Sequence, residues 1–277
     1  MNGVVTGESE QLNSAAGQLL LQMKAAGVEY VLANAGTDFP SLIEAFSDAS
    51  LRDRLPKPMA IHHENVAMGM AHGYHLLSGR MAAVMVHVNV GLANCVMGTI
   101  NAAASQVPLL LMSGRTPATE TGRFGSRVTA IHWGQEMYDQ AAMIREPVKW
   151  EYELRFPEQA ATAAARAIAI ATSAPAGPVY LSLPREVLAQ TVSDPLRPPV
   201  MPPIKPSSPN PQALQEAADL LTSANSPVIV LQRGLPKGRI PGLLELCEAF
   251  AIPVVEYWAT ANAVPTTHAM YAGFDPN

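Results

Sequence analysis

Residues 59–74 read MAIHHENVAMGMAHGY, and this stretch puts a carboxylate between a strand and a helix. The apolar residues Met59 to Ile61 predict a strand, and the small residues that follow Glu64 predict a helix. A carboxylate at a helix N-terminus is stabilised by the helix dipole. The same place is the carboxyl end of a strand, where open α/β sheets bind their ligands. Glu64 is therefore either a helix-capping residue or a functional group.

Strands and helices alternate on both sides of this segment. Further strands are predicted at residues 30–33, 81–87, 107–112 and 178–183, with helices at about 14–26, 40–46, 65–77, 92–104 and 157–172. The strand residues are mostly apolar, which is typical of parallel strands that are buried on both faces. The alternation predicts an α/β fold with a doubly wound parallel sheet.

The chain is predicted to have four parts. Residues 1–12 are polar and predicted to be disordered, and residues 13–190 form the first domain. A proline-rich linker covers residues 191–210, and residues 211–277 begin a second, Rossmann-like α/β domain. Two strands and two helices cannot close such a domain, and they leave an open sheet edge. We therefore expect the second domain to be incomplete, its continuation being missing or supplied by another chain.

Composition excludes several classes of protein. Of the 277 residues 48% are hydrophobic and 15% are charged, and the net charge is -5 without a basic block. Nucleic-acid binding therefore has no electrostatic footprint. The N-terminus does not read as a signal peptide, and the longest apolar run is too short to span a membrane. Cys95 and Cys247 are predicted to be buried free thiols of a cytoplasmic protein.

Three further segments follow residues 59–74 in the chain. They are GLANCVMGTINAA at 91–103, PLLLMSG at 108–114 and GPVYLSLP at 177–184. Together the four segments resemble the pyrimidine-binding domain of thiamine diphosphate enzymes, in the branch that contains acetolactate synthase, pyruvate oxidase and benzoylformate decarboxylase. The resemblance covers about residues 13–190, and residues 227–277 resemble the start of that branch's central domain.

The resemblance gives Glu64 a catalytic role. In this family the glutamate hydrogen-bonds the aminopyrimidine ring nitrogen and favours the imino tautomer, which then removes the C2 proton of the thiazolium ring. His87 falls where the benzoylformate decarboxylase type has a histidine that handles protons on the substrate, and its pKa range suits that work. The alternative for His87 is a hydrogen-bonded histidine at a strand end.

Four more residues are candidates for cofactor binding. Gly36 and Thr37 match a glycine-containing turn, although Ala35 replaces the family's usual proline, and Thr37 is expected to assist His87 at the substrate. Asn94 opens the helix after His87, where it serves either the ligand or subunit packing. Gln135 lies where the family has a Gln-Glu pair near the active site.

A long loop from Gly114 to about Trp133 carries three arginines. Arg115, Arg123 and Arg127 either meet an anionic substrate, meet a neighbouring subunit, or belong to a solvated loop. Exposed ion pairs contribute little to stability, and the solvated loop is the expected arrangement.

The family's diphosphate and magnesium motif, Gly-Asp-Gly, does not occur in this chain. The resemblance implies that Mg²⁺ and the diphosphate are bound by a C-terminal domain or partner chain, so no metal ligands are expected among the residues here. It also implies a homodimer or homotetramer and a small 2-keto acid substrate. The predicted activity is decarboxylation or carboligation, by a lyase or transferase. FAD in the central domain is left open. The alternative function is a non-catalytic assembly subunit or remnant.

Overall fold

The structure, a computed structural model, describes residues 13–193, 200–204, 207–231, 240–257 and 262–275. The chain divides into two compact units, residues 1–205 and residues 206–277. The predicted disorder of residues 1–12 lies outside the described residues, as does part of the predicted proline-rich linker. Among the described helices none is both long and apolar enough to cross a membrane.

The first unit contains a parallel six-stranded sheet with the order β2-β1-β3-β4-β6-β5. Its strands are β1 (Tyr30–Ala33), β2 (Lys57–Ala60), β3 (Ala83–Val86), β4 (Leu109–Arg115), β5 (Glu151–Glu153) and β6 (Pro178–Pro184). This confirms the predicted doubly wound parallel sheet. Strand β5 was missed because its residues Glu-Tyr-Glu form no apolar run.

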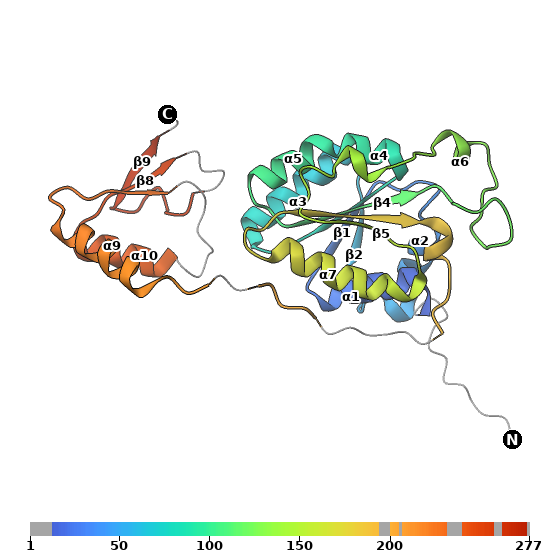
Figure 1. Ribbon diagram of the computed structural model, residues 1–277, viewed down its shortest axis with the longest axis horizontal. Coiled ribbons are helices and arrows are strands. Elements are labelled where there is room, and N and C mark those ends of the chain that lie inside the picture. Colours follow the sequence, from blue (N-terminus) through green and yellow to red (C-terminus); the bar gives the residue numbers. More distant parts are fainter. Residues whose placement is uncertain (1–12, 194–199, 205–206, 232–239, 258–261, 276–277) are drawn as a thin grey trace, which may run out of the picture. The chain divides into compact units, whose positions relative to one another are not determined.

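Helices cover both faces of the sheet (Figure 1). They are α1 (Ala15–Ala25), α2 (Pro40–Ser47), α3 (Glu64–Ser78), α4 (Val88–Asn94), α5 (Val96–Ala104), α6 (Ile131–Gly134), α7 (Ala160–Thr172) and α8 (Arg185–Leu188), with short 3₁₀ turns at Ala49–Leu51, Ala141–Met143 and Pro157–Gln159. Helices α1, α2 and α7 lie on one face, and α3, α4 and α5 on the other (Figure 1). Both faces of the central strands are therefore buried.

Alternation along the strands supplies the two cores. Side chains along a strand point to opposite faces, so Val31 belongs to the apolar cluster that includes α1, α2 and α7, whereas Leu32 belongs to the cluster that includes α3 and α4. The same alternation separates Ala83 from Val84 in β3. The strands are thus apolar at consecutive positions because both of their faces are buried against helices.

One predicted boundary was wrong. The helix expected at residues 92–104 begins at Val88 and is interrupted at Cys95, which divides it into α4 and α5. Gly91, just before the predicted start, lies inside α4, and a Cβ added there would come within 2.9 Å of Val86 Cβ. The glycine is thus required by close packing rather than by a helix terminus.

The second unit contains a smaller parallel sheet with the order β7-β8-β9. Its elements are α9 (Pro211–Ser223), β7 (Ile229–Leu231), α10 (Ile240–Phe250), β8 (Val254–Tyr257) and β9 (Tyr271–Asp275). Strand β9 was not predicted, whereas the other elements match the expected start of a Rossmann-like domain. Cys247 is buried in its core, and Cys95 is buried in the first unit; both are free thiols.

Candidate functional site

Parallel strand directions bring three loops together at one edge of the first sheet. The loop after β1 carries Asp38, Glu64 begins α3 after β2, and His87 precedes α4 after β3. Because β1 lies between β2 and β3, these carboxyl ends are neighbours. Open α/β sheets bind ligands at such an edge.

Glu64 is the first residue of α3 and is only 9% exposed. Asn94 donates a hydrogen bond from Nδ2 to Glu64 Oε2 at 3.0 Å, and His63 Nδ1 lies 3.8 Å from the same oxygen. No described residue hydrogen-bonds Glu64 Oε1, which faces Gly91 closely enough that a Cβ there would lie 3.3 Å away. Asn94 thus fixes Glu64 through Oε2, while Oε1 is left without a hydrogen bond from the described residues.

The charge of Glu64 affects its surroundings. Burial, followed by the charge of Glu64, raises the pKa of Cys95 to about 12. The same charge contributes to a raised pKa at His87. Glu64 and His87 therefore interact electrostatically within one site, because charges act over several ångströms in a low-dielectric environment.

His87 forms the centre of a second set of contacts. Its Nδ1 lies 2.5 Å from Asp38 Oδ1, and its Nε2 lies 3.1 Å from Gln135 Nε2. The Asp38 side chain is 3% exposed and that of His87 is 18% exposed. The pKa of His87 is raised, chiefly by the hydrogen bond with Asp38 and further by the charges of Asp38 and Glu64, while burial opposes the shift. A histidine tuned in this way can hold or deliver a proton near neutral pH.

The backbone beside His87 is strained. Val88 has φ +27°, a conformation that β-branched residues rarely adopt. Its N–H donates to Asp38 Oδ2 at 3.3 Å, so one carboxylate contacts both the ring and the strained peptide. Strain of this kind persists where surrounding contacts over-determine the geometry, and it concentrates at functional sites.

Two glycines make room for the Asp38–His87 pair. A Cβ added at Gly36 would overlap His87 Nδ1, and one added at Gly114 would overlap Asp38 Oδ2. Neither glycine has a positive φ in the described chain, so close approach rather than turn geometry requires them.

Replacing Gly114 by Ala is expected to destabilise the first unit by about 1–3 kcal/mol, because the new methyl group displaces the buried Asp38 carboxylate. Denaturant unfolding measures the change. The matched control is Gly69→Ala inside α3, where no atom lies within 4 Å of the added Cβ. That variant should be neutral or up to about 1 kcal/mol more stable. Equal effects of the two substitutions would contradict a steric role for Gly114.

Five of the six residues singled out from sequence fall into two connected groups. Asn94 contacts Glu64, and Gln135 contacts His87, with Gly36 packed against the same histidine. Thr37 is exposed and lies next to Asp38. Sequence reasoning missed Asp38, which it read only as part of a turn. The signal that could have identified Asp38 is a carboxylate in the loop after β1, because β1 neighbours β3, the strand that His87 follows.

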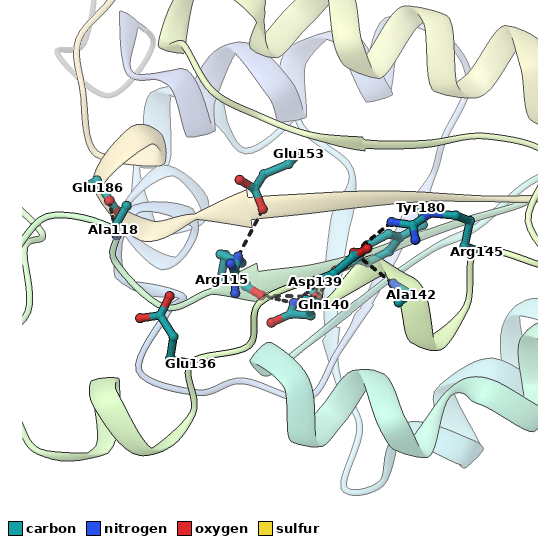
Figure 2. A network of polar contacts seen from close by, with 12 residues as sticks. Arg115, Ala118, Glu136, Asp139, Gln140, Ala142, Arg145, Glu153, Tyr180 and Glu186 are labelled. Carbon is teal, nitrogen blue, oxygen red and sulfur yellow. Dashed lines mark hydrogen bonds and ion pairs between the residues drawn. The ribbon is translucent and has the colours of Figure 1, made fainter.

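The arginine loop differs from its expected solvated form. The Arg115 side chain is 15% exposed and its Nε donates to Glu153 Oε2 at 3.1 Å, as Figure 2 shows. Arg127 is 9% exposed, pairs with Glu136 and donates to the Pro117 carbonyl. Glu186 fixes the same loop by accepting the N–H of Ala118 (Figure 2). The solvated arrangement is thus wrong for Arg115 and Arg127, whereas Arg123 is exposed.

A metal site in a protein gathers several acidic, histidine or cysteine side chains. In the part of the chain that the structure describes, no three such residues come together in a way that could hold an ion. The described site instead contains Glu64, with one carboxylate oxygen that no described residue hydrogen-bonds, and His87, whose ring contacts the carboxylate of Asp38. These groups suit hydrogen bonding and proton transfer to an organic ligand.

Comparison with known proteins places this geometry in context. Residues 13–143 match the family described as thiamine pyrophosphate enzyme, N-terminal TPP binding domain. A sulfoacetaldehyde acetyltransferase of Rhodobacter capsulatus is 30% identical over 248 residues, which is 89% of this chain and 39% of the relative. A benzoylformate decarboxylase of Pseudomonas aeruginosa is 29% identical over 220 residues, 77% of this chain and 40% of the relative. The chain therefore spans less than half the length of these relatives.

The fold has solved counterparts. A thiamine diphosphate-dependent 4-hydroxybenzoylformate decarboxylase of Rhodococcus jostii RHA1 superposes with a TM-score of 0.77 at 22% identity. The match covers 94% of this chain and 47% of that protein. At this identity the likeness establishes the fold. Together with the domain match, it confirms the resemblance found from the four sequence segments.

Proposed function

The chain resembles the thiamine diphosphate-dependent enzymes through a TPP binding domain at residues 13–143, and we propose that it supplies the aminopyrimidine side of a thiamine diphosphate site. The observation that carries the proposal is the carboxylate of Glu64, which the described residues hydrogen-bond through only one of its two oxygens. One of its oxygens is bound by Asn94, and no described residue hydrogen-bonds the other. Gly91 packs closely against that oxygen, since a Cβ added at Gly91 would lie 3.3 Å from Glu64 Oε1.

Thiamine diphosphate, when bound, supplies a thiazolium ring that stabilises negative charge at the carbon from which a carboxylate departs. The role of Glu64 is to share a proton with the aminopyrimidine ring nitrogen. Its burial makes this hydrogen bond stronger than it would be in water. Asn94 keeps the carboxylate oriented by donating to the opposite oxygen. We assign Gly36, Thr37, Asn94 and Gln135 to the walls of the cofactor site.

His87 is the second proposed catalytic group. Asp38 holds its ring through Nδ1, so that Nε2 is the nitrogen that can exchange a proton with a substrate. Gln135 contacts this nitrogen and would be displaced or would turn when a substrate arrives. His87 thus protonates or deprotonates the reacting group, while Glu64 serves the cofactor.

The proposed reaction is cleavage or ligation of a small 2-keto acid. Two relatives bear on this class: one is named a benzoylformate decarboxylase, after a 2-keto acid, and the other a sulfoacetaldehyde acetyltransferase, after an aldehyde. The first name indicates a lyase and the second a transferase, and a histidine at the position of His87 is compatible with proton transfer in either. We propose a cytoplasmic homo-oligomer that binds Mg²⁺ and the diphosphate through a C-terminal domain or partner chain. FAD in the central domain stays an open possibility.

A non-catalytic assembly subunit is the alternative. It requires the fold but not the chemistry. The buried Asp38–His87 pair and the strained Val88 are costly features that packing alone does not need. They favour the catalytic role.

The test is binding of thiamine to this chain, followed by NMR. We expect weak binding that shifts the backbone signals of Glu64 and Gly91, with nearly equal affinities for thiamine and thiamine diphosphate and no effect of Mg²⁺. The reason is that, under this proposal, the described residues would contact only the aminopyrimidine. Glu64→Ala should remove the shifts. Tight, magnesium-dependent binding would contradict the proposal that this chain supplies only the aminopyrimidine side of the site. Absence of shifts at Glu64 would contradict the proposed function.

A further inference from the structure

A narrow cleft lies next to His87, on the side of Gln135. Its lining includes Arg115, Thr116, His132, Gln135 and Arg185, together with Thr37 and Asp38 from the loop after β1. The cleft has a volume of about 10 Å³. That is room for one water molecule or one oxygen atom of an acidic group.

Three polar atoms on the cleft residues are buried without a hydrogen-bond partner. Among the described residues they are Arg115 Nη1, Thr116 Oγ1 and Gln135 Oε1. Leaving buried polar groups unpaired is costly, and native proteins rarely gather several in one place. The clustering of three around one cleft indicates a group that completes their hydrogen bonds.

The charges around the cleft favour an anion. Glu153 contacts only Nε of Arg115, so the end of that guanidinium remains available. Arg185 contacts the His132 ring, Nη1 to Nε2, at 3.4 Å. The pKa of His132 is lowered, first by burial and then by the positive charges of Arg185, Arg127 and His87. Asp38 also lines the cleft, but its carboxylate oxygens contact His87 and the Val88 N–H rather than the two arginines.

The amide of Gln135 adapts to the protonation of His87. With a neutral ring, Gln135 Nε2 donates to His87 Nε2, and Gln135 Oε1 is left without a partner. A protonated ring has a second N–H to donate, which favours the reversed amide with Oε1 toward His87. The amide NH₂ then becomes a further donor available to the cleft.

We propose that Arg115, Thr116, Gln135 and Arg185 form a subsite for one oxygen of a second acidic group on the substrate, a carboxylate or sulfonate that is retained through the reaction. The proposal rests on the proposed function for its substrate class. The departing carboxylate of a keto acid is a poor occupant, because it loses its charge as CO₂ forms. A pair of arginines would stabilise its ground state and slow the reaction. An acidic group that survives the reaction carries no such penalty.

The binding test uses the whole chain without thiamine. Sodium acetate and sodium methanesulfonate are titrated separately at constant ionic strength, and the side-chain Nε–H signals of the arginines are followed by ¹⁵N NMR. We expect saturable shifts of Arg115 and Arg185. Arg115→Gln should raise the dissociation constant on the order of ten- to a hundred-fold, the effect of losing one charge-assisted hydrogen bond. The tighter of the two probes identifies the acidic group.

Two controls make the result decisive. Arg145 is an exposed arginine paired with Asp139 and Glu151, so Arg145→Gln should leave the titration unchanged. Arg115→Lys keeps the charge and should lose less affinity than Arg115→Gln, which separates loss of charge from misfolding. Shifts that do not saturate, or that are as large at Arg145, would overturn the subsite.

This result is independent of thiamine chemistry. Saturable anion binding without C2 proton exchange in the complete assembly would count against the proposed function alone. Exchange without anion binding would count against the subsite alone.

Discussion

Glu64→Gln is expected to lower the rate of C2 proton exchange in bound thiamine diphosphate by about 10²–10⁴-fold, the usual loss for one positioned acid–base group. Glutamine matches glutamate in size and can still accept the hydrogen bond from Asn94, so packing at the start of α3 is retained. It cannot share an acidic proton with the ring nitrogen. Cofactor affinity should therefore change only a few-fold.

The measurement is C2 proton exchange in the complete assembly, followed by NMR after rapid acid quench. Glu44→Gln is the matched control, since Glu44 is an exposed glutamate on α2. It should exchange at the wild-type rate. A Glu64→Gln variant that also exchanges at the wild-type rate would leave Glu64 as a helix-capping residue only.

His87→Ala is expected to slow the proton-dependent step of turnover by about 10²-fold or more, again as the loss of a positioned acid–base group. The affinity for thiamine diphosphate should stay within a few-fold, because Glu64 and Asn94 remain in place. Pre-steady-state kinetics of the complete assembly separates the two effects. If each step keeps its wild-type rate, the histidine is structural.

The contact with Asp38 gives this prediction a pH dependence. The pKa of His87 is raised chiefly by Asp38, so a step that needs the protonated ring should slow as the pH rises through that pKa. Asp38→Asn removes the largest cause and should move the midpoint to lower pH. The exposed Asp53→Asn control should not move it. An unchanged profile in Asp38→Asn would show that Asp38 does not tune the histidine.

The sequence determined the layout of the first unit. Apolar runs and small-residue helices alternate, and parallel strands buried on both faces require that pattern. The segment with Glu64 therefore identified a strand end, a helix start and a carboxylate together. Boundaries were weaker: the helix predicted to begin at Leu92 begins at Val88, so Gly91, which packs closely against Val86 and Glu64, lies within α4. Strand β5 escaped notice because its polar residues give no periodic signal.

Only the tertiary structure decided which distant residues meet. Asp38 and His87 are 49 positions apart, and their contact depends on β1 and β3 being neighbours. Arg115 reads as a loop residue, but Glu153 from β5 holds it against the cleft. Sequence spacing gives the chemistry available at each strand end, since residue type and periodicity are local properties. Strand order sets the distances between those ends, and strand order is a property of the whole packed sheet.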